Sequence, residues 1–170
     1  MVKSITEKCS AKINIAIDVL GKYPNGYHEV RMIMTQVGIF DVITISLKDE
    51  KGIEIAGSDI NMPVDESNLA WKAANEFFKA IKFDGGCDIY IEKHIPMGAG
   101  MAGGSSDAAA TMIGMNRLFN LGLTVKEMMK RAVAIGADVP YCLLRGTALA
   151  EGIGEQLRPC LLYTSDAADD

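Results

Sequence analysis

One stretch of this sequence constrains the fold more than any other: a glycine-rich run that ends in two serines. It reads Pro-Met-Gly-Ala-Gly-Met-Ala-Gly-Gly-Ser-Ser-Asp over residues 96–107. Glycine lets the backbone approach a ligand closely and adopt conformations that other residues avoid. The pattern before the run is strand-like and the pattern after it is helical. Because a helix N-terminus presents unpaired N–H groups and a partial positive charge, this junction is a natural site for a phosphate.

The residues on either side support this interpretation. Cys87–Glu92 alternates apolar and polar residues, which predicts a strand, and residues 105–119 have helical spacing. The hydroxyls of Ser105 and Ser106 would then stand at the helix start, where they could bind phosphate oxygens or a phosphate-bound Mg²⁺. The alternative is a tight strand-to-helix turn that needs glycine only for its geometry.

Two common phosphate loops fit the run poorly. No Gly-Lys-Ser/Thr follows it, so it is not a Walker A loop. Gly98-x-Gly100-x-x-Gly103 matches the dinucleotide fingerprint, which also needs a second parallel strand after the helix. Here Thr124-Val-Lys-Glu is a capping box that opens another helix instead. A dinucleotide-binding oxidoreductase is therefore disfavoured.

The rest of the chain predicts an α+β fold whose first third is largely antiparallel sheet. Residues 11–19 alternate, so Ile13, Ile15, Ile17 and Val19 are expected to share the core face of a half-buried strand. Further strands are predicted at 29–37, 42–47, 52–56 and 147–150. A helix is predicted over 68–83 with Ser67 as its cap, and the helix opening at Thr124 is expected to end at Gly136.

Composition and charge exclude several classes of protein. With 49% hydrophobic and 23% charged residues the chain has the composition of a globular protein. Its 17 Lys and Arg against 22 Asp and Glu give a net charge of −5, which disfavours a nucleic-acid binder or an anionic-membrane binder. No apolar run is long enough to cross a membrane, and Glu7, Lys8 and Lys12 interrupt any signal peptide.

The cysteines and histidines point to no metal centre. Cys9, Cys87, Cys142 and Cys160 are dispersed, and together with His28 and His94 they form no zinc pattern. We expect reduced thiols in a cytoplasmic protein.

The glycine-rich run resembles the ATP-binding motif of the GHMP small-molecule kinases. Three further pieces strengthen the resemblance: Ala11-Lys12-Ile13-Asn14, Gly26-Tyr27-His28 and Gly136-Ala137-Asp138-Val139-Pro140. It implies a GHMP kinase N-terminal domain over residues 1–159, with the fold of ribosomal protein S5 domain 2: a largely antiparallel sheet with helices on one side. The last two pieces point to the family member of the non-mevalonate isoprenoid route, which uses ATP to phosphorylate the 2-hydroxyl of a cytidine-diphosphate-linked polyol.

The resemblance also implies roles for individual residues. Lys12 and Asp138 match the catalytic pair, and Asn14, Tyr27 and His28 match positions at the substrate. The positions implied to bind ATP are Pro96, Met97, Gly98, Ala99, Gly100, Met101, Ala102, Gly103, Gly104, Ser105, Ser106 and Asn68. Mg²⁺ would accompany ATP, with Ser105 as its ligand from the chain.

Simpler roles compete at most of these positions. Lys12 and His28 could be ordinary surface residues, Tyr27 could merely flank a turn, and Asn68 could simply start a helix. Asp138 could be a turn aspartate. If Asp138 is the catalytic base, it is expected to follow the end of a helix. The partial negative charge there would raise the pKa of Asp138, and the nearby ammonium of Lys12 would lower it.

Three charged residues beside the run have alternative interpretations as well. Asp107 is expected to complement the helix dipole rather than to bind a metal. Lys93 and His94 fit either a basic flank for a polyphosphate or a solvated strand end.

Part of the family pattern is missing from this sequence. Nothing matches the second, C-terminal domain of these kinases, and residues 160–170 read as a tail foreign to the domain. Three alternative functions remain: a homoserine, mevalonate or galactose-type kinase, the related decarboxylase, or a non-catalytic nucleotide- or RNA-binding module. The oligomeric state is unknown.

Overall fold

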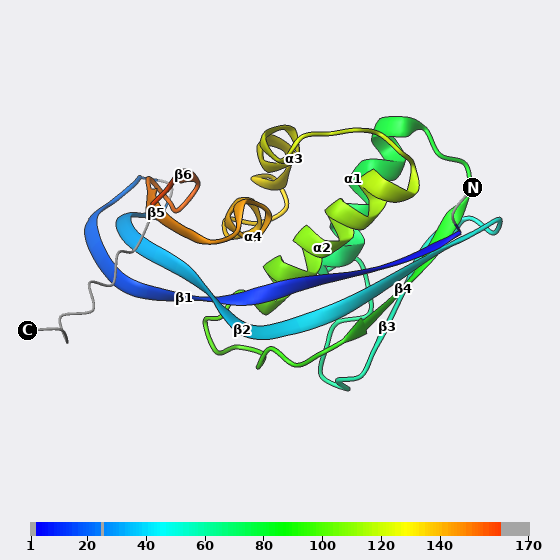
Figure 1. Ribbon diagram of the computed structural model, residues 1–170, viewed down its shortest axis with the longest axis horizontal. Coiled ribbons are helices and arrows are strands. Elements are labelled where there is room, and N and C mark those ends of the chain that lie inside the picture. Colours follow the sequence, from blue (N-terminus) through cyan, green and yellow to red (C-terminus); the bar gives the residue numbers. More distant parts are fainter. Residues whose placement is uncertain (1–2, 25, 161–170) are drawn as a thin grey trace, which may run out of the picture.

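A computed structural model of the chain describes residues 3–24 and 26–160, which form one mixed sheet with helices on one of its faces (Figure 1). The six strands are β1 (Ser4–Lys22), β2 (His28–Lys48), β3 (Gly52–Gly57), β4 (Gly86–Glu92), β5 (Thr147–Glu151) and β6 (Gln156–Pro159). The described helices are α1 (Leu69–Ile81), α2 (Gly103–Leu118), α3 (Val125–Ala132) and α4 (Val139–Leu144). The predicted α+β class is confirmed. No helix in the described ranges has both the length and the apolar character needed to span a membrane.

The long strand β2 organises the sheet. One edge of β2 pairs with β1 along most of its length, and the other edge pairs with β4 and then with β5. All pairs are antiparallel except β3 with β4. Residues 29–37 and 42–47, predicted as two strands, form one continuous strand, because β1 stays paired with β2 past Gly38 through a register shift between Ser10 and Lys12.

The alternation in β1 does not mark a core face, so that prediction is wrong. Ile13, Ile15, Ile17 and Val19 are 40–62% exposed. Helix α2 packs on the part of β1 that precedes Lys12: its Gly114 lies against Ile5, and its Ser106 hydroxyl donates to the Ser10 carbonyl at 2.8 Å. The later half of β1 therefore extends beyond the part of the sheet that α2 covers.

Helix α2 is the centre of the core, and its small residues explain why. Ala108, Ala109 and Ala110 are fully buried. A Cβ at Gly114 would lie only 2.7 Å from the Ile45 Cδ1 atom on β2. Small side chains thus let α2 lie between the sheet and α1 at a separation that larger residues would prevent.

The helix ends differ from several predictions. Asn68, not Ser67, caps α1: its Oδ1 accepts from the Ala70 amide at 2.9 Å, while Ser67 bonds to Asp65. Helix α2 begins at Gly103 rather than at 105, and α3 ends at Ala132, well before Gly136. The capping box at Thr124 is present.

Two elements were not predicted at all. Helix α4 is only one and a half turns long, and its apolar residues are almost all buried, so it shows no amphipathic pattern. Strand β6 is short and, within the part of the chain that the structure describes, pairs with β5 alone. Beyond it, the Cys160 amide donates to the Thr147 carbonyl at 3.0 Å, so backbone pairing continues one residue past the predicted domain end at 159. The remainder of the predicted tail lies outside the described residues.

Candidate nucleotide site

The glycine-rich run forms the loop between β4 and α2. Gly98 and Gly100 have φ angles of +70° and +71°, a region that other residues rarely adopt. Ala102, with φ of +59°, is the N-cap of α2, and no described side chain caps that helix. The first turn of α2 thus directs its backbone N–H groups toward the loop without a competing side-chain acceptor, as an anion site requires.

The loop lines a cavity of about 410 Å³. Most of the wall is the loop itself, residues 96–104, and the opposite wall comes from the segment before α1. The residues outside the loop that line the cavity are Met62, Pro63, Ser67, Asn68, Leu69, Lys93, Asp107 and Asp138. The sequence did not indicate Met62, Pro63 or Leu69, because they are joined to the loop only through the fold.

Lys12 and Asp138 meet beside this cavity. The Lys12 ammonium lies 3.6 Å from the Asp138 carboxylate, and it also donates to Asn14 Oδ1 at 3.2 Å. The Lys12 side chain is only 6% exposed, so it is not an ordinary surface lysine. Its backbone amide donates to the Met101 carbonyl at 3.1 Å, at the register shift of β1, which fixes the strand to the loop. The fold thus brings Asp138 to Lys12 and Asn14, which belong to a different motif in the sequence.

The expected setting of Asp138 is wrong. The nearest preceding helix, α3, ends at Ala132, and Asp138 is the residue immediately before α4. It therefore lies at the start of a helix, where the backbone dipoles favour a negative charge, rather than at the end of one.

The two serines at the start of α2 differ in orientation. Ser106 is fully buried, its hydroxyl donates to the Ser10 carbonyl at 2.8 Å, and its amide donates to Ala102 at 2.8 Å. Both groups are engaged within the fold, which is at odds with a direct phosphate contact. Ser105 is partly exposed, although it is not among the residues that line the cavity.

Asn68 lines the cavity and caps α1 at the same time. Its Oδ1 accepts from Ala70, and its Nδ2 donates to the Pro63 carbonyl at 2.7 Å. The simpler helix-start role is therefore present, and a contact with a nucleotide stays a prediction.

The structure does not bring Tyr27 and His28 to this cavity. Both are exposed: His28 is the first residue of β2 and pairs with Lys22, and Tyr27 directly precedes that strand. Lys12, in contrast, pairs with Gln36 much further along the same strand pair. Any role of Tyr27 and His28 toward a substrate stays a prediction.

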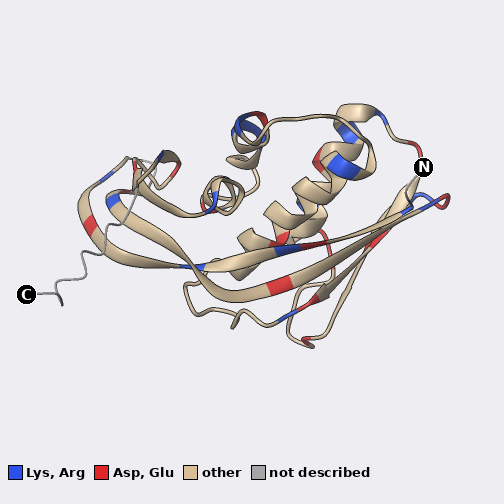
Figure 2. Cartoon of the chain, in the orientation of Figure 1, with Lys and Arg blue, Asp and Glu red and all other residues tan. Residues whose placement is uncertain are grey.

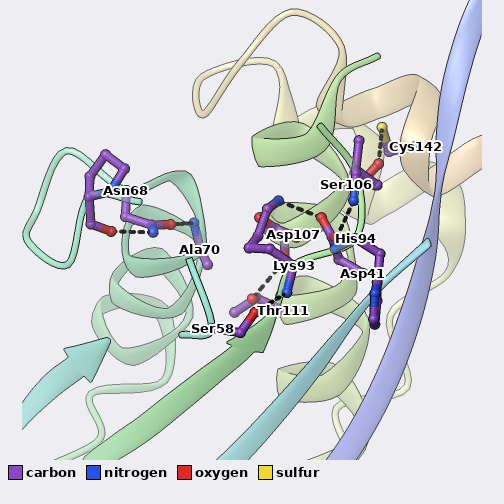
Figure 3. A network of polar contacts seen from close by, with 12 residues as sticks. Asp41, Ser58, Asn68, Ala70, Lys93, His94, Ser106, Asp107, Thr111 and Cys142 are labelled. Carbon is purple, nitrogen blue, oxygen red and sulfur yellow. Dashed lines mark hydrogen bonds and ion pairs between the residues drawn. The ribbon is translucent and has the colours of Figure 1, made fainter. Parts of the chain in front are cut away.

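A buried cluster of charges lies under the loop (Figure 3). Lys93, on the segment after β4, donates from its ammonium to Asp41 of β2 and, at 2.8 Å, to Asp107 of α2. Lys93 is thus neither a solvated strand end nor a free phosphate ligand. Burial raises the pKa of Asp107 to about 7, against the attraction of Lys93. Asp107 is therefore more than a surface complement to the helix dipole. His94 is half-exposed and pairs with Glu92.

Charges elsewhere on the molecule form no single pattern. Figure 2 shows Lys and Arg interspersed with Asp and Glu on helices and strands alike. Within the described residues no group of three or more His, Cys, Asp or Glu side chains could hold a metal ion. The described cysteines, Cys9, Cys87, Cys142 and Cys160, are free thiols in the structure.

Comparison with known proteins places this architecture in a family. Residues 68–146, which include the loop, α2 and Asp138, match the model for the N-terminal domain of GHMP kinases. The chain contains a GHMP kinase N-terminal domain. A relative from Lachnospira eligens, named 4-diphosphocytidyl-2-C-methyl-D-erythritol kinase, is 53% identical over 156 residues, which cover 92% of this chain and 54% of the relative.

Solved structures share the same GHMP kinase N-terminal fold. A crystal structure of 4-(cytidine 5'-diphospho)-2C-methyl-D-erythritol kinase matches with a TM-score of 0.79 and 33% identity, over 94% of this chain and 56% of that one. Homoserine kinase from Cytophaga hutchinsonii matches with a TM-score of 0.70 and 21% identity, over 93% of this chain and 51% of that one, and shows the fold alone. The chain spans about half the length of the curated relatives it matches.

Proposed function

We propose that this domain binds ATP as part of a kinase that phosphorylates the 2-hydroxyl of 4-diphosphocytidyl-2-C-methyl-D-erythritol. One observation carries the proposal: a buried ammonium and a carboxylate, Lys12 and Asp138, lie 3.6 Å apart beside a cavity walled by the glycine-rich loop. Phosphoryl transfer depends on positioning and on charge neutralisation, and this arrangement can supply both. The names of the relatives, at 45–53% identity, point to the substrate.

The loop and the first turn of α2 would hold the polyphosphate. The left-handed glycines Gly98 and Gly100 leave open space around their Cα atoms, so phosphate oxygens can approach the backbone closely. Of the positions expected to bind ATP, residues 96–104 line the cavity directly. Ser106 would contribute indirectly, by tying α2 to β1 through the Ser10 carbonyl.

The chain's own residues fit Mg²⁺ only as an ion carried by the nucleotide. No cluster of acidic or imidazole ligands exists among the described residues, and the Ser105 hydroxyl is the one ligand that the resemblance assigns to the chain. When bound with ATP, the ion would neutralise part of the phosphate charge.

Asp138 and Lys12 would act on the reacting groups. Asp138 would accept the proton of the substrate hydroxyl while the hydroxyl oxygen bonds to the γ-phosphorus of ATP. The bond between the γ-phosphorus and the oxygen that bridges it to the β-phosphate would break, and ADP would leave. Lys12 would stabilise the negative charge on the phosphoryl group during transfer, with Asn14 orienting its ammonium. Tyr27 and His28 are proposed to contact the cytidine end of the substrate.

The domain would occupy residues 1–159, to which Cys160 adds its backbone bond with Thr147, and a second domain would complete the substrate site in a protein of the relatives' length. The tail of residues 160–170 is proposed to be foreign to the domain in its sequence. The same proposal places the protein in the cytoplasm.

Two measurements test the function separately. Calorimetric titration of the 170-residue chain with ATP and Mg²⁺ tests nucleotide binding. Titration of ATP and Mg²⁺ into buffer alone gives the heat of dilution to be subtracted. A chimera of residues 1–159 joined to the C-terminal part of the Lachnospira eligens relative tests catalysis. We expect ADP release only when the cytidine-linked polyol is present; equal release with homoserine or mevalonate would contradict the proposed substrate.

A further inference from the structure

Three buried charged groups from three separate elements meet beneath the glycine-rich loop. Asp41 of β2 is fully buried, the Lys93 side chain is 5% exposed, and Asp107 of α2 is 3% exposed. Burying a charge costs several kcal/mol per ion unless it is paired with an opposite charge. Even when the charges are paired, three apolar side chains of similar volume would often stabilise the fold equally well. The contacts of the cluster therefore matter more than its contribution to stability.

Asp41 holds the segment that enters the loop. Its Oδ1 accepts from the backbone amides of His94 and Ile95, at 2.6 and 2.8 Å, and its Oδ2 accepts from the Lys93 ammonium. Three consecutive residues, 93–95, are thus bonded to one carboxylate directly before Pro96. Figure 3 shows Asp41 with Lys93 and His94.

Lys93 also bonds to α2, the helix that follows the loop. Its ammonium donates to Asp107 Oδ2 at 2.8 Å, and a Cβ at Gly103 would lie 3.3 Å from its Nζ. The other oxygen of Asp107 is buried without a hydrogen-bond partner among the described residues, so Lys93 is the group that holds this carboxylate. The start of α2 therefore packs directly on the ammonium.

We propose that Asp41 and Lys93 are positioning residues that set the conformation of the glycine-rich loop by fixing its two ends to each other. Residues 96–100 belong to no strand or helix, while Met101 accepts from Lys12 of β1 and Ala102 accepts from Ser106 of α2, so the shape of the loop depends on where residues 95 and 103 are held. The network connects both points through one ammonium. The consequence for ATP rests on the proposed function, whereas the effect on the loop itself does not.

Hydrogen–deuterium exchange of the loop amides, without nucleotide, tests the proposal in the 170-residue chain. Asp41→Asn keeps an oxygen that can accept from the amides of His94 and Ile95, but its NH₂ group, a hydrogen-bond donor, would face the Lys93 ammonium, which is also a donor. Lys93→Met removes the ammonium. We expect amides 97–104 to exchange about tenfold faster in both variants, with β4 and α1 amides unchanged. Lys93→Arg, which still donates to both carboxylates, is expected to restore most of the protection.

Lys48→Met is the matched control. Lys48 also lies between two carboxylates on this sheet, Glu54 and Asp88, but does not line the cavity. Its loss should leave loop exchange unchanged. Loop exchange within twofold of the parent chain in both Asp41→Asn and Lys93→Met would overturn the proposal, as would equal acceleration in Lys93→Arg and Lys93→Met.

ATP titration of the same proteins separates the two proposals. If the parent chain binds ATP, we expect Lys93→Met to bind it at least about fivefold more weakly, since a misplaced loop presents fewer amides to the phosphates. If the parent chain does not bind ATP, the proposed function fails, and loop exchange still decides the role of Asp41 and Lys93.

Discussion

The Lys12 ammonium and the Asp138 carboxylate, contributed by β1 and by the residue before α4, lie 3.6 Å apart. The pair is joined to the glycine-rich loop through the Lys12 amide, which donates to the Met101 carbonyl, and Asp138 lines the cavity that the loop walls. In the proposed function, this geometry would place a proton acceptor and a phosphate-neutralising cation beside the glycine-rich loop.

Asp138→Asn in the chimera should therefore lower kcat by about 10²- to 10⁴-fold, because the amide cannot accept the hydroxyl proton. The Kd for ATP should change little. Steady-state kinetics together with calorimetry check both values, and turnover that survives in this variant would remove Asp138 from the role of base.

Gly98→Ala or Gly100→Ala should weaken ATP binding by several-fold. Both residues have φ near +70°, where a side chain costs about 1–2 kcal/mol. A Cβ would also enter the open space that, in the proposed function, phosphate oxygens would occupy. Gly122→Ala is the control, since Gly122 has a φ of +66° and open space but lies outside the cavity. A similar loss of ATP affinity in Gly122→Ala would indicate general strain instead of a local effect.

Asn68→Ala separates the two roles that this residue could have. Losing the cap should lower the free energy of unfolding by about 1 kcal/mol. Thr124→Ala, at the cap of α3, should cost about the same without affecting ATP. A fall in ATP affinity confined to Asn68→Ala, measured beside chemical denaturation of both variants, would support the predicted nucleotide contact; equal affinities would leave Asn68 with the cap alone.

Asp107 should make the protein less stable as the pH rises. Its pKa is raised by burial from 3.8 to about 7, so between those values the folded state holds a proton that the unfolded state has released. The free energy of unfolding then falls as the pH increases from about 4 to 7 and levels off above that. Asp107→Asn, which mimics the protonated form, should flatten this dependence. Thermal unfolding at pH 5 and pH 8 checks it: a slope unchanged in the variant would assign the effect to another group.

Much of the architecture could be predicted from local patterns. The strand before the loop, the helix after it and the capping box at Thr124 all follow from periodicity and from side chains that bond to their own backbone. The sequence predictions are wrong where the packing of other elements, and not the local residue pattern, decides which side chains are buried. The alternation of Ile13 to Val19 looked like a core face, yet α2 covers only the earlier part of β1.

The charged residues show the same division. The sequence places Lys93 as a basic neighbour of the loop, but its partners Asp41 and Asp107 are brought to it by the pairing of β2 with β4 and by the packing of α2. Asp41 had no signal of its own, because a single acid within an apolar strand segment gives no indication of what it contacts.

The sequence by itself determined that a glycine-rich loop joins a strand to a helix, because glycine freedom and residue periodicity are local properties of the chain. Only the tertiary structure decided which charged side chains lie near that loop and which of them pair with one another. Lys12 reaches Asp138 while Lys93 is occupied by Asp41 and Asp107, and these pairings depend on which elements pack together and on how deeply they exclude water. Long-range contacts of this kind are fixed by the burial of the whole core, which no short stretch of residues records.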